Sequence, residues 1–87
     1  MVYVVKLKPS AEKELAKIPE KYRLRILTGL VILRKEPFSG KKLAGEFKDY
    51  YSLRIWPYRI IYTIYKTKLL VIVICIGHRQ GIYKRNN

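Results

Sequence analysis

The chain is poor in the residues that most often carry catalysis or bind metals. It has one cysteine, Cys75, and one histidine, His78. One cysteine permits no internal disulfide, and this usage is typical of a reducing compartment, so we expect a cytoplasmic protein. Cys75 lies in an apolar run, which favours a buried structural thiol over a nucleophile. Cys75 and His78 alone do not make a metal site, and we predict neither a metal nor a cofactor.

Long hydrophobic runs are also missing. The longest, residues 69–76, is far shorter than the roughly 20 residues that cross a bilayer. The first residues alternate apolar side chains with lysines and lack the layout of a signal peptide. The chain has no P-loop, no acidic cluster for Mg²⁺ and no Ser/His/Asp set. With 87 residues, 49% of them hydrophobic, we expect a single globular domain over residues 1–87.

Acidic residues are scarce, and their distribution is uneven. The chain has 19 Lys and Arg against six Asp and Glu, a net charge of +13. All six acids lie within residues 1–49, whereas residues 50–87 carry seven basic residues and no acid. A merely solvated surface mixes both signs, so we expect the second half to carry an anion-binding face. Nucleic acid is the first interpretation, and an acidic protein or a membrane surface remain alternatives.

Hydrophobic periodicity predicts a strand followed by two helices. Residues 2–8 alternate as a strand, and Pro9 with Ser10 should end it, with Ser10 capping the first helix. Pro19 separates that helix from a second one over residues 20–35. The first helix should bury Ala11, Leu15 and Ile18, and the second Tyr22, Ile26, Leu27, Leu30 and Leu33.

The rest of the chain predicts a sheet. After a glycine-punctuated connection over residues 38–49, strands are expected over residues 50–56, 58–65 and 69–76. The last is apolar on both faces and should be central, with Gly77 releasing the chain beyond it. The expected fold is α+β, in the order β-α-α-β-β-β, with the helical hairpin packed on one face of a twisted, mainly antiparallel sheet.

Three arginines and the histidine are the candidate site. Alternation places Arg54 and Arg59 on neighbouring strands, and Arg79 follows the end of the last strand beside His78. No acid in the second half can pair with them. Guanidinium groups match phosphate oxygens, so this arrangement favours phosphate binding over a solvated surface. His78 is either incidental or a proton-transfer group. Tyr83 either packs the C-terminus onto the sheet or stacks an RNA base.

These residues predict a cationic module that binds a phosphodiester. If the protein also cleaves the phosphodiester, the cleavage should need no metal. The 2′-OH of RNA would attack its own phosphate while arginines stabilise the developing charge, a route that selects RNA over DNA.

Three features match a known family: the element order, KLAG at residues 42–45, and YYSLRIWPYRIIYTIYKTKLLVIVICIGHRQGIY at residues 50–83. Together they resemble the RelE/ParE toxin superfamily, in its RelE-like branch. The resemblance covers essentially the whole chain, and YSLRIWPYRIIY followed by GHRQGIY is its most specific part. It implies the toxin of a type II toxin–antitoxin pair, a ribosome-dependent mRNA endonuclease (mRNA interferase) that inhibits translation. Its implied partners are the ribosome, mRNA and a cognate antitoxin, acidic where it makes contact, in a hetero-oligomer, with no membrane.

The resemblance also implies roles for individual residues. Arg59 matches the arginine that contacts the scissile phosphate, Arg79 the one that stabilises the transition state, and Tyr83 the tyrosine that orients the base. Arg54 stands where the family often has a catalytic lysine. Further RNA contacts are expected from Arg54 and from Lys48, Lys84 and Arg85.

The chain departs from the family pattern at three places. Ser52 replaces a lysine that is a candidate base, Ala44 replaces a phosphate-contacting arginine, and His78 replaces a lysine. We therefore expect His78 to act as the substitute acid or base. Two alternatives remain open: a ParE-like poison of DNA gyrase, and a non-catalytic module that binds RNA or the ribosome.

Overall fold

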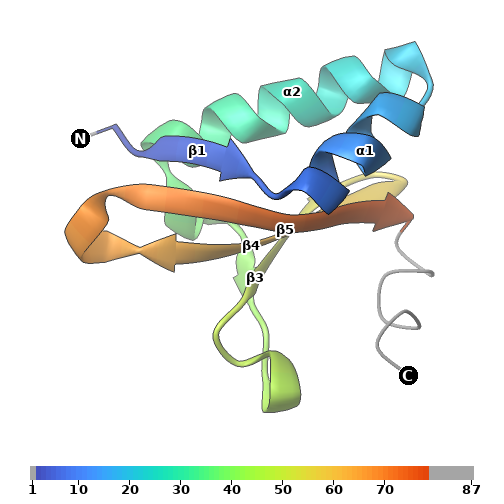
Figure 1. The fold of residues 1–87 in the computed structure, drawn as a ribbon. Helices are drawn as coiled ribbons and strands as arrows, with labels where there is room; N and C mark the ends of the chain where they lie inside the picture. Colours follow the sequence, from blue (N-terminus) through green and yellow to red (C-terminus); the bar gives the residue numbers. More distant parts are fainter. Residues whose placement is uncertain (1, 79–87) are drawn as a thin grey trace.

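A five-stranded sheet forms one layer of the protein. The computed structural model describes residues 2–78, and its sheet has the order β1-β5-β4-β3-β2 (Figure 1). β1 runs parallel to β5, and the remaining neighbouring pairs are all antiparallel. The strands are β1 (Val4–Leu7), β2 (Lys41–Lys42), β3 (Tyr51–Ile55), β4 (Tyr58–Tyr65) and β5 (Leu70–His78). The predicted α+β class and the antiparallel meander of the last three strands are confirmed.

Two helices, α1 (Pro9–Lys17) and α2 (Glu20–Lys35), cover one face of this sheet (Figure 1). The bounds of α2 are those predicted from the sequence. The expected cap of α1 is wrong: the N-cap is Lys8, Pro9 occupies the first turn, and the Ser10 hydroxyl donates to the Ile74 carbonyl at 3.4 Å. A proline is favoured there because its missing N–H would have no helical partner. No helix within residues 2–78 is long and apolar enough to cross a bilayer.

The core lies between the two helices and the sheet, and includes Ala11 of α1. Ile26, Leu30 and Leu33 of α2 are buried as predicted, whereas Leu27 is 42% exposed and does not belong to the core. Gly29 lies at the closest approach, where an added Cβ would meet the Ile55 side chain at 2.9 Å. The absence of a side chain at Gly29 therefore lets α2 settle onto β3, which offsets the cost of glycine within a helix.

β5 is an interior strand of the sheet, as the sequence predicted, because it lies between β1 and β4. Val71, Val73 and Ile76 are buried in the core. The expected release of the chain at Gly77 is wrong: the strand continues through His78, which pairs with Tyr58. A register shift occurs between Ile61 and Tyr62, so the two ends of β4 meet β5 with different offsets.

The connection between α2 and β3 contains more structure than the sequence indicated. It holds two 3₁₀ turns, Pro37–Ser39 and Gly45–Phe47, and the two-residue strand β2. Figure 1 shows the part around Gly45–Phe47 projecting from the sheet on the side away from the helices. We call residues 43–50 the projecting loop.

The Tyr62 phenol fastens this connection to the sheet. Its hydroxyl donates to the Pro37 carbonyl at 2.7 Å and accepts from the Gly40 N–H at 3.1 Å. Its ring is fully buried and stacks on that of Tyr51, with 5.6 Å between the centroids. Burial raises the pKa of Tyr62 to about 12.

We expect Tyr62→Phe to lower the free energy of unfolding by about 1–3 kcal/mol, because it leaves a partly buried N–H and a buried carbonyl without their partner. The phenol of Tyr62 binds its proton more tightly in the folded chain, with a pKa of about 12 against about 10 in the unfolded chain. Its contribution is therefore complete below pH 10 and is lost as the pH rises from 10 to 12.

Urea denaturation at pH 7, 10 and 12 measures this difference. The stability gap between the parent and Tyr62→Phe should narrow across the upper two values. Tyr65→Phe, which removes a hydroxyl from a ring that is 45% exposed, is the control and should show neither effect. A gap that stays constant up to pH 12 would contradict the assignment.

Candidate nucleic-acid interface

The face of the sheet opposite the helices, which we call the open face, carries two facing arginines. Arg54 of β3 and Arg59 of β4 are direct partners across the strand pair, so both side chains lie on the same face. Arg54 is exposed and Arg59 is half-buried. Like charges in this position repel one another, and an anion close to both would offset that repulsion.

Arg59 is the better fixed of the two. One of its terminal nitrogens donates to the Ser52 hydroxyl at 3.3 Å, and Ser52 is only 3% exposed. Its Nε is buried and has no hydrogen-bond partner among residues 2–78. A buried donor on a charged group without a partner is costly. Gly77 is the direct partner of Arg59 on β5, so the position opposite Arg59 on that strand carries no side chain.

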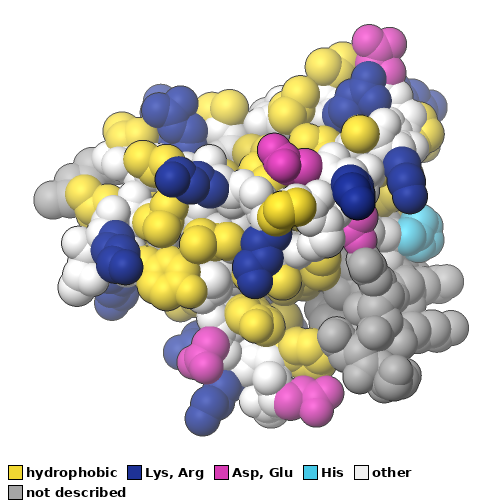
Figure 2. Space-filling model, in the orientation of Figure 1, with side chains coloured by type: hydrophobic (Ala, Val, Ile, Leu, Met, Phe, Trp, Pro, Cys, Tyr) yellow, Lys and Arg dark blue, Asp and Glu magenta, His cyan; other side chains and the backbone are white. Residues whose placement is uncertain are grey.

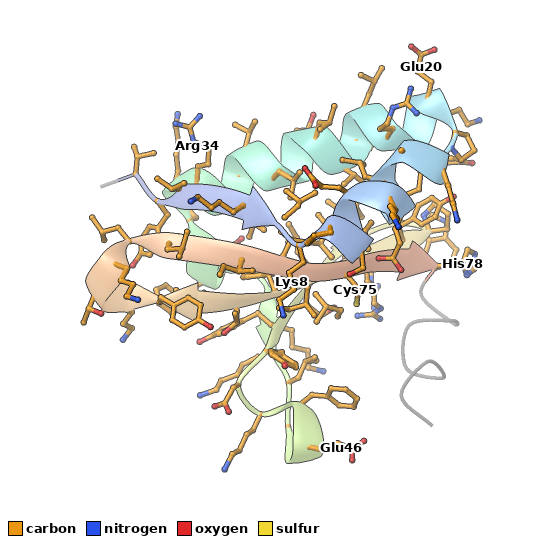
Figure 3. All side chains as sticks on the ribbon, viewed as in Figure 1. Lys8, Glu20, Arg34, Glu46, Cys75 and His78 are labelled. Atoms are coloured by element: carbon orange, nitrogen blue, oxygen red, sulfur yellow. The ribbon has the colours of Figure 1, made fainter. Side chains whose placement is uncertain are left out.

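His78 lies on the other face of the sheet. It pairs with Tyr58, which packs against the core on the helix side. The Tyr58 and His78 rings are 6.0 Å apart edge to face, and Tyr58 also meets Tyr22 of α2 at 5.7 Å. His78 is exposed at the end of β5 (Figure 3). Among the described residues, the structure therefore brings Arg54 and Arg59 together and separates His78 from them, contrary to the expected cluster.

The remaining predicted residues divide into two groups. Arg79, Tyr83, Lys84 and Arg85 lie outside the described residues, and their roles stay predictions. Lys48 lies in the projecting loop and is exposed.

The sequence did not single out a groove on the open face, whose volume is about 560 Å³. It runs between the projecting loop and the part of the sheet where β4 ends and β5 begins. Three lysines line it, Lys8, Lys42 and Lys48, with one acid, Asp49. We call it the lysine groove. Lys8 and Lys42 come from separate parts of the chain, so only the fold brings them beside Lys48. Basic side chains also lie over the helices, so charge alone does not mark the groove (Figure 2).

Cys75 fits the structural interpretation. It pairs with Ile61, is partly buried, and burial raises the pKa of its thiol. The neutral thiol is therefore favoured over the reactive thiolate. Within residues 2–78, no three His, Cys, Asp or Glu side chains come together as metal ligands, and the absence of a metal stays a prediction.

Comparison with known proteins assigns this chain to one class. Residues 5–83 match the family model described as the ParE toxin of the type II toxin–antitoxin system parDE. The chain therefore belongs to the RelE/ParE family, and is a toxin of a type II toxin–antitoxin system.

Individual proteins that are similar to this chain support the same assignment. The chain is 33% identical over 91 residues to Toxin RelG of Mycobacterium tuberculosis, covering 98% of this chain and 100% of that one. Among solved structures, it resembles the toxin–antitoxin complex RelBE2 of the same organism, with a TM-score of 0.85 and 27% identity over 91% of this chain and 93% of that one. It also resembles the RelE–RelB complex of Pyrococcus horikoshii, with a TM-score of 0.77 and 29% identity over 91% and 97%.

Proposed function

We propose that this toxin is an endoribonuclease that cleaves mRNA on the ribosome, and that it inhibits translation in this way. The observation that carries the proposal is the arginine pair on the open face. Arg54 and Arg59 face one another, and Arg59 holds a buried N–H that has no partner among the described residues. A phosphate between the two guanidinium groups would relieve the repulsion and give that N–H an acceptor.

The reaction would be a transfer within the RNA chain. The 2′-oxygen forms a bond to the adjacent phosphorus, the bond to the 5′-oxygen breaks, and a 2′,3′-cyclic phosphate and a 5′-hydroxyl result. Arg59 would stabilise the charge that develops on the phosphate oxygens, with Arg54 as a second cation. The hydrogen bond to Ser52 fixes the direction of the Arg59 guanidinium, so that its charge is positioned before the substrate binds.

The roles of the groups around the reacting atoms other than Arg54 and Arg59 are assigned only from the resemblance to the family. Arg79 would support the leaving group and Tyr83 would orient the base, as in the family. Among the described residues, the strand partners of Arg59 are Arg54 and Gly77, and its hydrogen-bond partner is Ser52. None of these transfers protons readily near pH 7. His78 would have to reach round the end of β5 to act there.

That lack of a base supports a second candidate, a module that binds RNA without cutting it. The nature of the RNA ends separates the two. We expect mRNA recovered from programmed ribosomes to end in a 2′,3′-cyclic phosphate upstream of the cut and in a 5′-hydroxyl downstream. Uncut mRNA would favour the binding module. A 3′-hydroxyl with a 5′-phosphate would refute the proposed chemistry.

The apolar groove between the helices supports an antitoxin partner. It is lined by Leu7, Leu15, Ala16, Leu27 and Leu30, with Glu12 and Arg23 also lining it. The outer side of α2 exposes three further apolar residues, Leu24, Val31 and Ile32. An apolar groove flanked by exposed apolar side chains is typical of an interaction site. We propose that an amphipathic helix of the cognate antitoxin binds here in a hetero-oligomer, and that acidic residues of the antitoxin face the +13 chain.

We expect Leu27→Asp to weaken antitoxin binding by roughly 10- to 100-fold, because it places a charge in the apolar groove. Calorimetric titration of the toxin with the antitoxin encoded beside it measures the change. Thr28→Asp adds the same charge at the next position of α2, is exposed and does not line the groove. Equal losses in the two variants would place the antitoxin elsewhere.

A further inference from the structure

The lysine groove lies on the same face as the arginine pair but at the other end of the strands. Thr63, Ile64 and Tyr65 of β4 line it, whereas Arg59 lies near the start of that strand. Four to six residues of strand at about 3.3 Å each separate the two sites by roughly 13–20 Å. This span is too long for one phosphate to touch both sites, but a continuous RNA chain can cover it.

The side chains around the groove suit a polyanion. Lys8, at the junction of β1 and α1, extends to the side of the sheet away from the helices (Figure 3). Lys42 lies in β2 and Lys48 in the projecting loop, both line the groove, and all three lysines are exposed. Asp49 is the single acid in the lining, and its backbone carbonyl accepts a hydrogen bond from the Thr63 hydroxyl at 3.1 Å. The groove is therefore cationic, with a net side-chain charge of +2 from three lysines and one aspartate.

The groove also offers ring surface for a base. Tyr65 is 45% exposed in the lining, and Tyr50 is half-buried there. Proteins that bind single-stranded nucleic acid usually combine basic side chains along the phosphate backbone with aromatic rings that stack on the bases. The volume of about 560 Å³ lies in the range of sites that hold one small-molecule unit, so it suits one nucleotide and its phosphate.

We propose that the lysine groove binds the backbone of the same RNA chain whose phosphate lies between Arg54 and Arg59, a few nucleotides from the cut. The proposal rests on the proposed function, because it takes the arginine pair as the site of the scissile phosphate. RNA is favoured over an acidic antitoxin segment because the arginine pair and most of the groove lining lie on one face of the sheet, whereas the apolar surface that a helix needs lies on the opposite side, between α1 and α2. Lys8, Lys42 and Lys48 would act as binding residues and take no part in the chemistry.

The test measures binding without cleavage. The probes are fluorescent RNA oligonucleotides that carry 2′-O-methyl groups throughout, so that no 2′-OH can attack. One is three nucleotides long and the other nine. The variant is the double substitution Lys42→Gln with Lys48→Gln. The matched control, Lys13→Gln with Lys17→Gln, removes the same charge from exposed positions of α1, outside the groove. Circular dichroism melting curves establish that all the proteins are folded.

We expect the parent to bind the nine-nucleotide probe more tightly than the three-nucleotide probe. The groove variant should bind the longer probe roughly 10- to 30-fold more weakly at 0.1 M salt, with the slope of log K against log salt smaller by about 1.4, because each lysine that neutralises a phosphate contributes about 0.7. The shorter probe should bind the groove variant and the control variant with the same affinity.

Equal losses in the groove variant and the control variant would overturn the proposal, because general charge would then explain them. Unchanged RNA binding together with weaker antitoxin binding would also overturn it, and would assign the groove to the antitoxin. The two hypotheses fail separately. Absence of cleavage on ribosomes leaves this binding result intact, and loss of the difference between the probes leaves cleavage at Arg59 intact.

Discussion

Arg59→Ala should reduce mRNA cleavage on programmed ribosomes by about 100- to 1,000-fold, the effect of removing one preorganised donor from a developing oxyanion. The guanidinium of Arg59 is held by Ser52, faces Arg54 and keeps a buried N–H that has no partner among residues 2–78. The initial rate of cleavage at saturating toxin measures the effect. Arg59→Lys should recover only a small part of the rate, because an ammonium group does not reproduce the fork of the guanidinium.

Two further variants make this result specific. Arg25→Ala removes a basic residue from α2, where it lies over the Tyr22 ring, and should leave the rate within about threefold. His78→Ala tests the imidazole, which the structure places on the helix side. A loss in His78→Ala as large as that in Arg59→Ala would mean that the imidazole reaches the open face. A full rate in Arg59→Ala would contradict the site.

Gly40→Ala should lower the free energy of unfolding by about 2–3 kcal/mol, which is about 30- to 150-fold in the folding equilibrium. A Cβ at Gly40 would overlap the Tyr62 hydroxyl and lie 2.9 Å from the backbone oxygen of Ser52. The hydroxyl cannot move away cheaply, because it bonds Pro37 and Gly40 itself. The backbone of β3 cannot move without disturbing its pairing with β4.

Thermal unfolding measures this change, and for a chain of 87 residues the expected drop in Tm is about 10–20 °C. Ser39→Ala, at the exposed neighbouring position, is the control and should leave the Tm within about 2 °C. A Gly40→Ala protein as stable as the control would mean that the connection over residues 36–42 yields easily. Its attachment through Tyr62 would then be weak.

The fold was predictable because its elements have strong local signals. The bounds of α2 follow from Pro19 before it and Pro37 just after it, together with the spacing of Ile26, Leu30 and Leu33. β4 was predictable from its aromatic and β-branched residues, which lie between two turns. The order of the strands beyond the meander did not follow from the sequence, because the parallel pairing of β1 with β5 joins segments far apart in the chain.

The errors arose where the three-dimensional structure outweighed the local pattern. β2 is two residues long and forms only because β3 is beside it, so no periodicity announces it. Leu27 fits the apolar spacing of α2 but lies on the rim of the groove between the helices. Ser10 is a good capping residue, yet Pro9 occupies the first turn of the helix and moves the cap to Lys8.

The candidate site was predictable only in part, for a related reason. Alternation within β3 and β4 predicts which face each arginine takes, and Arg54 does face Arg59. The face of His78 depends on whether the strand continues past Gly77 and on the register shift between Ile61 and Tyr62. One step of register moves a side chain to the other face of a sheet. The lysine groove could not be foreseen, because its lysines come from separate parts of the chain.

The most direct test of the central claim uses the RNA itself. Programmed ribosomes receive mRNAs that differ in one atom: a single 2′-deoxynucleotide replaces the ribonucleotide that precedes the mapped cut. We expect the all-ribose mRNA to be cut, and the substituted mRNA to stay intact at that position while it is still cut at others. A cut that persists at the deoxynucleotide would contradict attack by the 2′-OH. If neither mRNA is cut by folded toxin free of antitoxin, the chain is not a nuclease.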